Sequence, residues 1–181
     1  MVYAMIANGT EEVECLAVVD ILRRAGIEVE LVSVEDTREI TSSHKVKIIA
    51  DRTVSEVALD TADMLFVPGG MPGSNRLAAC EKLVAALKEM NSRGKIIAAI
   101  CAAPAVVLGV NGLLEKKNAV CFPGFEDRLL GANLIKGGRV VTDGNIVTAR
   151  GLGCAVELGL ELVRLISGEQ KMLEIKDKIQ F

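Results

Sequence analysis

Short apolar segments alternate with helical patterns along this chain, and this alternation constrains the fold more than any other feature. Strands are expected at 2–7, 27–34, 64–67 and 95–100, with two more near 139–149. Continuous apolar strands that alternate with helices are typical of a mainly parallel sheet covered on both faces. The sequence therefore predicts an α/β fold with helices on both sides of the sheet.

The helical patterns fill the segments between these strands. Helices are expected at 11–25, closed by Gly26, at 81–92, from Pro104 onwards, and at 152–167. The polar stretch 36–50 fits a β-hairpin, and 169–178 has the charge pattern of a solvated helix face. No linker, repeat or low-complexity tract interrupts the pattern, so we expect residues 1–181 to form a single domain.

Composition excludes several classes of protein. Half of the 181 residues are hydrophobic and a quarter are charged, which excludes intrinsic disorder. No apolar run approaches the roughly 20 residues of a membrane helix. The net charge of −3, with one Tyr, four Phe and no Trp, argues against nucleic acid as a partner, because such proteins use basic stripes or stacking rings.

Cysteine usage indicates a reducing compartment. The chain has five widely spaced cysteines and no C-x-x-C pair, and 2–7 is read as a first strand rather than as a signal peptide. We therefore expect a cytoplasmic protein with free thiols. With one histidine and no cysteine cluster, the sequence carries no zinc signature, and no metal is expected.

Three segments follow predicted strands and should lie at the same edge of the sheet, where ligands bind in such folds. They are 8–11, 68–70 and 101–103. Gly69 and Gly70 fit a turn that needs positive φ, and the Gly70 amide could also face an oxyanion together with the Ala102 amide. The two interpretations are compatible.

Glu14 is the most informative position of this set. On a helix from 11 to 25, its neighbours on the wheel are apolar, among them Val18 and Ile21. A carboxyl group in the middle of an apolar face loses hydration, which raises its pKa. The alternative is a shifted helix register, or a side chain that reaches the rim of the sheet.

Cys101 lies between an apolar strand and Pro104, with small residues beside it. This pattern permits the sharp strand-to-helix turn of a nucleophile elbow, where the helix N-terminus favours a thiolate. The alternative is a buried cysteine that serves only packing. The other cysteines are interpreted as packing residues, and Cys121 could also line the cleft. His44, near the hairpin turn, is expected to be exposed or at an interface, far from the cleft loops.

Five motifs together resemble the DJ-1/ThiJ/PfpI superfamily, and within it the DJ-1-like branch. They occur in family order and cover nearly the whole chain: 8–14 (NGTEEVE), 20–26 (DILRRAG), 67–70 (VPGG), 98–104 (AAICAAP) and 148–153 (TARGLG). The resemblance implies a flavodoxin-like three-layer sandwich, and a homodimer with the first helix in its interface.

The resemblance also implies roles for individual residues. Cys101 is the reactive cysteine and Glu14 its protonated hydrogen-bond partner. The other implied residues surround them: Gly69, Gly70, Ala102, Phe122 and Gly151 at the oxyanion and substrate site, and Arg24 and His44 near the dimer interface. No metal or organic cofactor is implied.

Two departures from the pattern bear on activity. Much of this branch has a histidine before the proline of 121–123, where this chain has Phe122. The peptidase-like branch has a histidine directly after its cysteine, where this chain has Ala102. A class I amidotransferase would need a His-x-Glu pair near the C-terminus, which is absent. Proteolysis and glutamine hydrolysis are therefore poor interpretations.

Two functions remain as hypotheses. The first is a glutathione-independent glyoxalase or protein deglycase acting on small reactive carbonyls, converting methylglyoxal to lactate through a Cys101 hemithioacetal with Glu14 as acid and base. The second is a redox-sensing, stress-protective protein with chaperone-like effects, whose output is oxidised Cys101. A third, less specific reading is a protein that binds an unknown metabolite.

Overall fold

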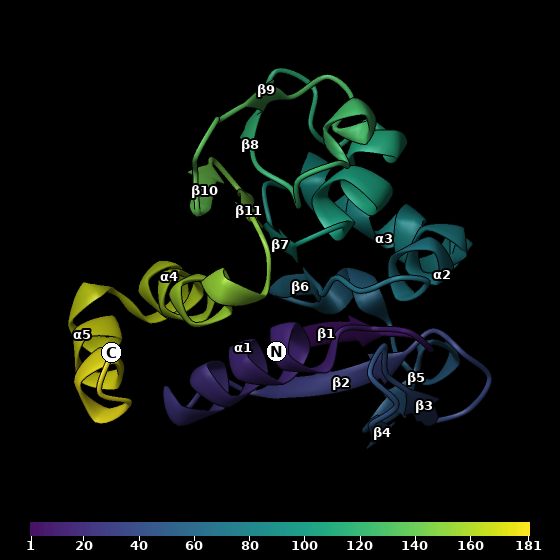
Figure 1. The fold of residues 1–181 in the computed structure, drawn as a ribbon. Helices are drawn as coiled ribbons and strands as arrows, with labels where there is room; N and C mark the ends of the chain where they lie inside the picture. Colours follow the sequence, from purple (N-terminus) through teal and green to yellow (C-terminus); the bar gives the residue numbers. More distant parts are fainter.

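The centre of the molecule is a seven-stranded sheet, shown in Figure 1 for the computed structural model, which describes residues 1–181. The strand order is β10-β11-β7-β6-β1-β2-β5. All neighbours pair in parallel except β10 with β11. The bounds are β1 Val2–Ile6, β2 Val29–Ser33, β5 Arg52–Thr53, β6 Met64–Val67, β7 Ile96–Ile100, β10 Val140–Asp143 and β11 Ile146–Ala149. The mainly parallel sheet is confirmed.

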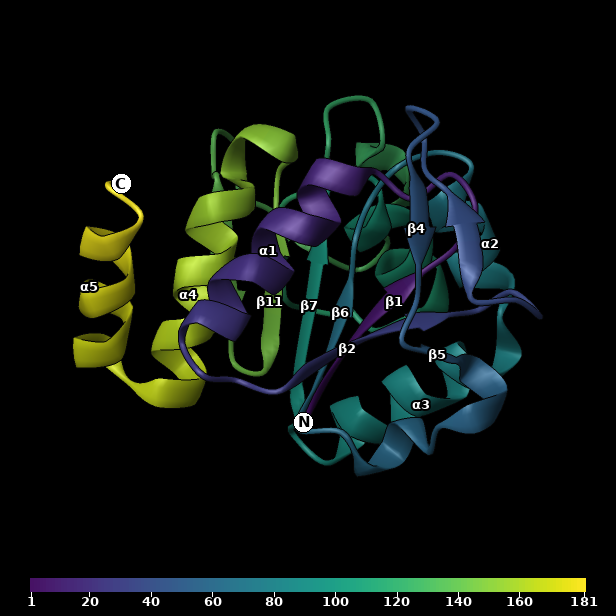
Figure 2. The ribbon, with the colours of Figure 1, turned by 90° about the horizontal axis from the view of Figure 1, so that it is seen from below.

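Helices cover both faces of this sheet (Figure 2). One face carries α1 (Glu12–Arg24) and α4 (Ala155–Ser167), with α5 (Glu169–Lys178) packed outside α4. The other face carries α2 (Gly73–Ala79), α3 (Glu81–Ser92) and a π-helical turn at Pro104–Leu108. This is the expected flavodoxin-like three-layer sandwich. None of its helices combines the length and the apolar character that crossing a membrane requires.

The side chains of β1 point alternately to the two faces of the sheet, and the core has one half on each face. Val2, Ala4 and Ile6 belong to a cluster of 26 buried residues on the α1 and α4 side. Tyr3 and Met5 belong to a second cluster of 26 on the α2 and α3 side. Successive side chains of a strand point to opposite faces, so a strand buried on both faces must be apolar throughout.

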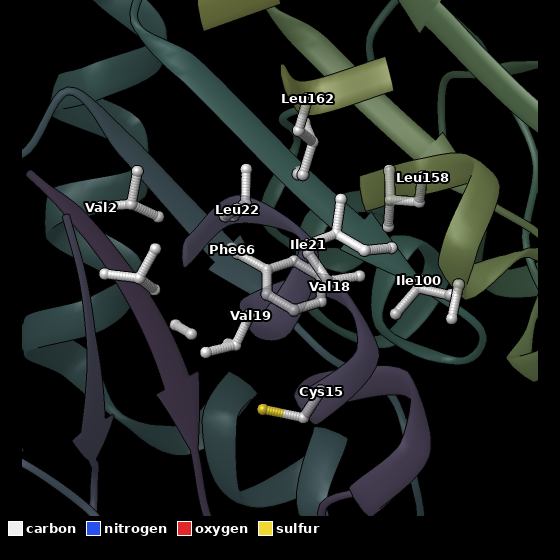
Figure 3. Packing of buried hydrophobic residues seen from close by; sticks show 14 of the residues in the cluster. Val2, Cys15, Val18, Val19, Ile21, Leu22, Phe66, Ile100, Leu158 and Leu162 are labelled. Carbon is white, nitrogen blue, oxygen red and sulfur yellow. The ribbon is translucent and has the colours of Figure 1, made fainter. Parts of the chain in front are cut away.

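The layer of α1 and α4 is closely packed around Phe66. Figure 3 shows its ring between Val18, Val19 and Ile21 of α1. Gly159 lets α4 approach α1 closely, because a Cβ at that position would lie 2.8 Å from Cδ1 of Ile21. This packing fixes α1, and with it the position of Glu14 at the first turn of the helix.

Several local expectations need correction. Helix α2 was not expected, because Pro72, Gly73 and Ser74 have the composition of a loop and the helix is short. The segment after Pro104 forms a π-helical turn of five residues rather than an α-helix. Helix α4 begins at Ala155, after a 3-10 turn at Leu152–Cys154.

Smaller elements complete the fold. The hairpin expected at 36–50 forms from β3 (Glu39–Thr41) and β4 (Lys47–Ile49), which pair in antiparallel fashion. A second small sheet joins β8 (Asn118–Ala119) to β9 (Asn133–Leu134). Helix α5 buries only Ile175, in agreement with the solvated face expected there.

Candidate active site

The chain turns sharply at Cys101, directly after β7. Cys101 has φ of +64°, in the left-handed region that L-residues rarely adopt. Its amide donates to the carbonyl of Ala149 at 2.9 Å, and its carbonyl accepts from the amide of Phe122 at 2.8 Å. A residue held in this conformation costs about 1–3 kcal/mol and persists only where the surroundings fix it. The strand-to-helix turn expected for a nucleophile elbow is present.

Two backbone amides approach the Cys101 sulfur. The amides of Ala102 and Gly70 both act to lower the pKa of the thiol, as donors to a negatively charged sulfur do. Gly70 has φ of +93°, and a Cβ there would collide with the backbone of Gly9, Thr10 and Glu11. Only glycine fits this turn, because a side chain would push residues 68–70 away from residues 9–11.

Glu14 is buried in the first turn of α1, on the apolar face that its spacing predicts. Its side chain lies beside Cys101, and its Oε2 has no hydrogen-bond partner of normal geometry. Burial raises the pKa of this carboxyl to about 7, and the negative charge of Glu11 adds to the rise. The Cys101 thiol and the amides of Gly69 and Leu152 oppose it. Glu14 is therefore partly protonated at neutral pH.

The protonation states of Cys101 and Glu14 depend on each other. Burial, and then the negative charge of Glu14, raise the pKa of the Cys101 thiol to about 12. This corrects the expectation that the helix N-terminus and the backbone donors hold a thiolate, because burial and the negative charge of Glu14 outweigh the amides of Ala102 and Gly70. At neutral pH the thiol therefore keeps its proton, and a thiolate forms only when that proton moves to the Glu14 carboxylate. The single negative charge of the pair then lies on sulfur.

Gly69 lies between these two side chains. A Cβ on Gly69 would collide with Oε2 of Glu14 and approach Cβ of Cys101. Its carbonyl accepts from the amide of Glu11 at 2.9 Å. The three segments that follow β1, β6 and β7 thus meet at one point, as their positions at the strand ends predict.

Phe122 and Gly151 form the outer wall of the site. The Phe122 ring is 45% exposed and packs edge to face against Phe125 at 6.5 Å between centroids. A Cβ on Gly151 would lie 3.1 Å from the Phe122 ring and 4.0 Å from Oε1 of Glu14. The wall next to the carboxyl group is therefore an apolar ring and a glycine, with no imidazole.

The two residues assigned to a dimer interface lie apart from each other. Arg24 is exposed near the far end of α1, about 15 Å along the helix from Glu14, and pairs with Asp20 at 2.5 Å. His44 was expected to lie far from the cleft loops, and this is wrong. Its Nδ1 lies 3.7 Å from Oε1 of Glu11 and 3.5 Å from Oε2 of Glu12, because the hairpin folds back onto the start of α1.

No separate role was predicted for Glu11 or Glu12. Glu11 is the N-cap of α1, where its Oε2 accepts from the amide of Glu14 at 2.6 Å. Glu12 is also buried, because it turns toward the hairpin. The signal for these positions was the run of three glutamates within 11–14, next to a glycine turn.

The largest surface cavity lies away from this site. It has a volume of about 670 Å³ and lies between α4, α5 and β10, lined by Arg139, Leu160 and Phe181 among others. A smaller cavity of about 290 Å³ is adjacent to the site wall, lined by Cys121, Pro123 and Arg150 among others. Cys121 is thus buried at the rim of a cavity, and Cys15 is fully buried in the core.

The chain is similar to known proteins over nearly its whole length. The model of the DJ-1/PfpI family matches residues 1–165. Protein DJ-1 homolog B of Arabidopsis thaliana is 38% identical over 170 residues, which are 94% of this chain and 39% of that protein, so this chain spans about two fifths of its length.

Two further relatives match over nearly their full length. The structure titled Toxoplasma gondii DJ-1, oxidized, superposes with a TM-score of 0.94 at 38% identity and covers 99% of this chain and 97% of that chain. The glutathione-independent glyoxalase DJR-1.2 of Caenorhabditis elegans is 30% identical over 162 residues, 89% of this chain and 85% of that protein. With its elbow cysteine, its buried glutamate and this fold, the chain belongs to the DJ-1/PfpI family, in the DJ-1-like branch.

Proposed function

We propose that the protein is a cofactor-independent enzyme that converts small α-oxoaldehydes such as methylglyoxal into 2-hydroxy acids such as lactate. The observation that carries this proposal is the contact of Cys101 with Glu14, whose pKa of about 7 suits a group that both takes and gives a proton. The relative named as a glutathione-independent glyoxalase supports the reaction class. Deglycation of proteins would use the same pair.

The reaction begins when the Glu14 carboxylate takes the proton of the Cys101 thiol, so that the negative charge moves to sulfur. The thiolate of Cys101 attacks the aldehyde carbon and forms a hemithioacetal, while the amides of Gly70 and Ala102 donate to the developing oxyanion. The proton of Glu14 then neutralises this oxygen. The carboxylate that remains is next to the carbon that must lose its hydrogen.

Proton transfer between carbons completes the conversion. Glu14 removes the proton from the former aldehyde carbon, which gives an enediolate, and returns the same proton to the neighbouring carbon. The hydroxyl proton on the first carbon passes to the negatively charged oxygen of the second, so that the first carbon becomes a carbonyl. The product is a thioester of Cys101 with lactate. Water hydrolyses the thioester, which releases lactate and regenerates the thiol, so that methylglyoxal and one water give one lactic acid.

Lactate formation from methylglyoxal under metal-free and thiol-free conditions tests the proposal. We expect turnover by the wild type and loss of turnover by Cys101→Ala, because the hemithioacetal cannot form. A melting curve of each protein accompanies the assay. Equal lactate formation by both folded proteins would exclude the mechanism.

A second function is favoured by Phe122. The site wall has no imidazole to assist proton transfer, which leaves oxidation of Cys101 unaffected. In this alternative the protein is a stress-protective sensor whose output is the Cys101 sulfinate, stabilised by a hydrogen bond from protonated Glu14. Mass spectrometry after peroxide treatment, with negligible lactate formation, would favour the sensor. Oxidation of all five cysteines at similar rates would exclude it.

We also propose a homodimer built on α1 and β4. Large apolar side chains are exposed there, with Val13 47%, Leu16 38% and Ile49 74% accessible. We expect light scattering at micromolar concentration to give a dimer for the wild type and a monomer for Leu16→Glu. The control is Leu173→Glu, which changes an exposed leucine on α5. A monomeric wild type would remove the interface role of Arg24 and His44.

We place the protein in the cytoplasm. All five cysteines are free in the structure, which supports a reducing compartment.

A further inference from the structure

Outside the Cys101 and Glu14 pair, the fold assembles a second group of ionisable side chains. Glu11 and Glu12 come from the start of α1, and His44 comes from the tip of the β3–β4 hairpin, more than 30 residues later. One donor atom of each side chain lies within 4.8 Å of the others. Two carboxylates and one imidazole are therefore brought together by tertiary folding.

The separations in this group are those of ligands around one ion. Nδ1 of His44 lies 3.5 Å from Oε2 of Glu12 and 3.7 Å from Oε1 of Glu11, which is long for direct hydrogen bonds. Around a tetrahedral ion with bonds of about 2.0–2.2 Å, ligand atoms are separated by about 3.3–3.6 Å. The two distances from the imidazole nitrogen thus nearly match those between neighbouring ligands of one ion, and all three donor atoms lie within 4.8 Å of one another.

The two carboxylates are held in place before any ion binds. The side chain of Glu11 is only 10% exposed, and its Oε2 is fixed by the amide of Glu14 at 2.6 Å. Its Oε1 lies 3.7 Å from Nδ1 of His44. The side chain of Glu12 is 11% exposed and has only long contacts, at 3.3 Å from Ser43 Oγ and 3.4 Å from the His44 amide. Two carboxylates held side by side with little access to water favour a cation, because their charges are poorly hydrated.

The hairpin is fixed to the start of α1 by its backbone. The Ser43 amide donates to the Thr10 carbonyl at 2.9 Å, and the Gly9 amide donates to the Thr41 carbonyl at 2.8 Å. The Thr41 amide also donates to Oδ1 of Asn8 at 2.8 Å. These bonds hold His44 over the carboxylates although its own ring is 72% exposed, which leaves the outer side of the group open to water.

We propose that Glu11, Glu12 and His44 bind a divalent transition-metal ion of the zinc type, with water completing the shell. Carboxylate and imidazole ligands in a ratio of two to one suit Zn²⁺ or Co²⁺, and no thiol takes part. This site is separate from the Cys101 and Glu14 pair. The competing explanation is an ion pair between protonated His44 and the two glutamates, without metal.

Titration with Co²⁺ alone, and displacement by Zn²⁺, tests the site in full-length Cys101→Ala protein, in which the reactive thiol cannot bind metal. We expect saturable binding of one ion per chain, and a visible spectrum with ligand-field bands but no thiolate charge-transfer band. His44→Ala and Glu12→Gln, each added to that background, should weaken binding at least about 10-fold, because each removes a ligand.

Glu39→Gln in the same background is the matched control, because it removes an exposed hairpin carboxylate that pairs with Lys47. Its affinity for Co²⁺ should stay within about twofold of the background. A thiolate band, equal affinity in His44→Ala, or absence of saturable binding would each overturn the proposal. Two variants on different segments keep the test decisive if one of them fails to fold, and circular dichroism identifies that case.

Discussion

About two turns of α1 separate Glu14 from Ile21, and the two regions around them differ in how their buried atoms are satisfied. Around Ile21 the core contains apolar side chains from α1, α4 and β6 that pack against one another (Figure 3). Around Glu14 the same layer holds a buried carboxyl with an unpartnered oxygen, beside a cysteine with φ of +64°.

This difference shows which part of α1 stabilises the fold and which part forms the reactive site. The packed region around Ile21 and Leu158 gains free energy from apolar burial. The region around Glu14 and Cys101 bears the cost of desolvation and backbone strain, and the rest of the fold compensates for it. Changes in the first region should therefore affect stability, and changes in the second should affect turnover.

The largest effect is expected in the packed region. Leu158→Ala removes a fully buried side chain from α4 and should lower the free energy of unfolding by about 2–5 kcal/mol. Urea unfolding measures this change, and turnover per folded molecule should stay the same. Leu173→Ala, at an exposed position of α5, is the control and should cost less than about 0.5 kcal/mol. Equal losses in both variants would contradict the packing described for α4.

A pH titration of stability addresses the site itself. The folded pKa of Glu14 is raised from 4.5 to about 7, so the folded state binds its proton more tightly than the unfolded state does. The stabilisation from this proton is complete below pH 4.5 and is lost as the pH rises through 7. Between pH 4.5 and 7 we expect the free energy of unfolding of the wild type to fall by about 3 kcal/mol relative to that of Glu14→Gln. Parallel stability profiles of the two proteins would show that Glu14 is not desolvated.

Glu14→Gln should reduce turnover of methylglyoxal by about 10²-fold or more. The amide keeps the size of the side chain and can still donate to an oxidised sulfur, but it cannot accept a proton from carbon. Steady-state lactate formation measures the loss, and a melting curve shows that the variant is folded. Substantial and equal turnover by both proteins would exclude Glu14 as acid and base.

The smallest effect is expected at the wall of the site. Phe122→His introduces an imidazole next to Gly151 and should raise turnover about 10-fold, less than the 10²-fold or more of a fully positioned group. Phe125→His is the matched control, since it puts the same group on the neighbouring ring of the same loop. If turnover rises equally in both variants, the added imidazole acts generally, and its position beside Cys101 and Glu14 does not matter.

Part of this site follows from local sequence. The apolar strand before Cys101 and the small residues after it predict the elbow, because parallel strands end at the same edge of the sheet. The period of α1 predicts the burial of Glu14. Helix α2 could not be predicted in the same way, because the composition of 72–75 favours a loop and only packing against the sheet makes it helical.

The alternation of apolar strands and helices by itself determined the parallel sheet and the three layers, because these depend on short-range periodicity and on chain connectivity. It also determined that Cys101 and Gly70 would follow strand ends and that Glu14 would lie in the helix after the first strand. Tertiary structure alone decided the proton balance between Cys101 and Glu14, since a pKa depends on burial and on charges contributed by other segments. It also decided the position of His44, because a hairpin that folds back over α1 leaves no local signal in the sequence.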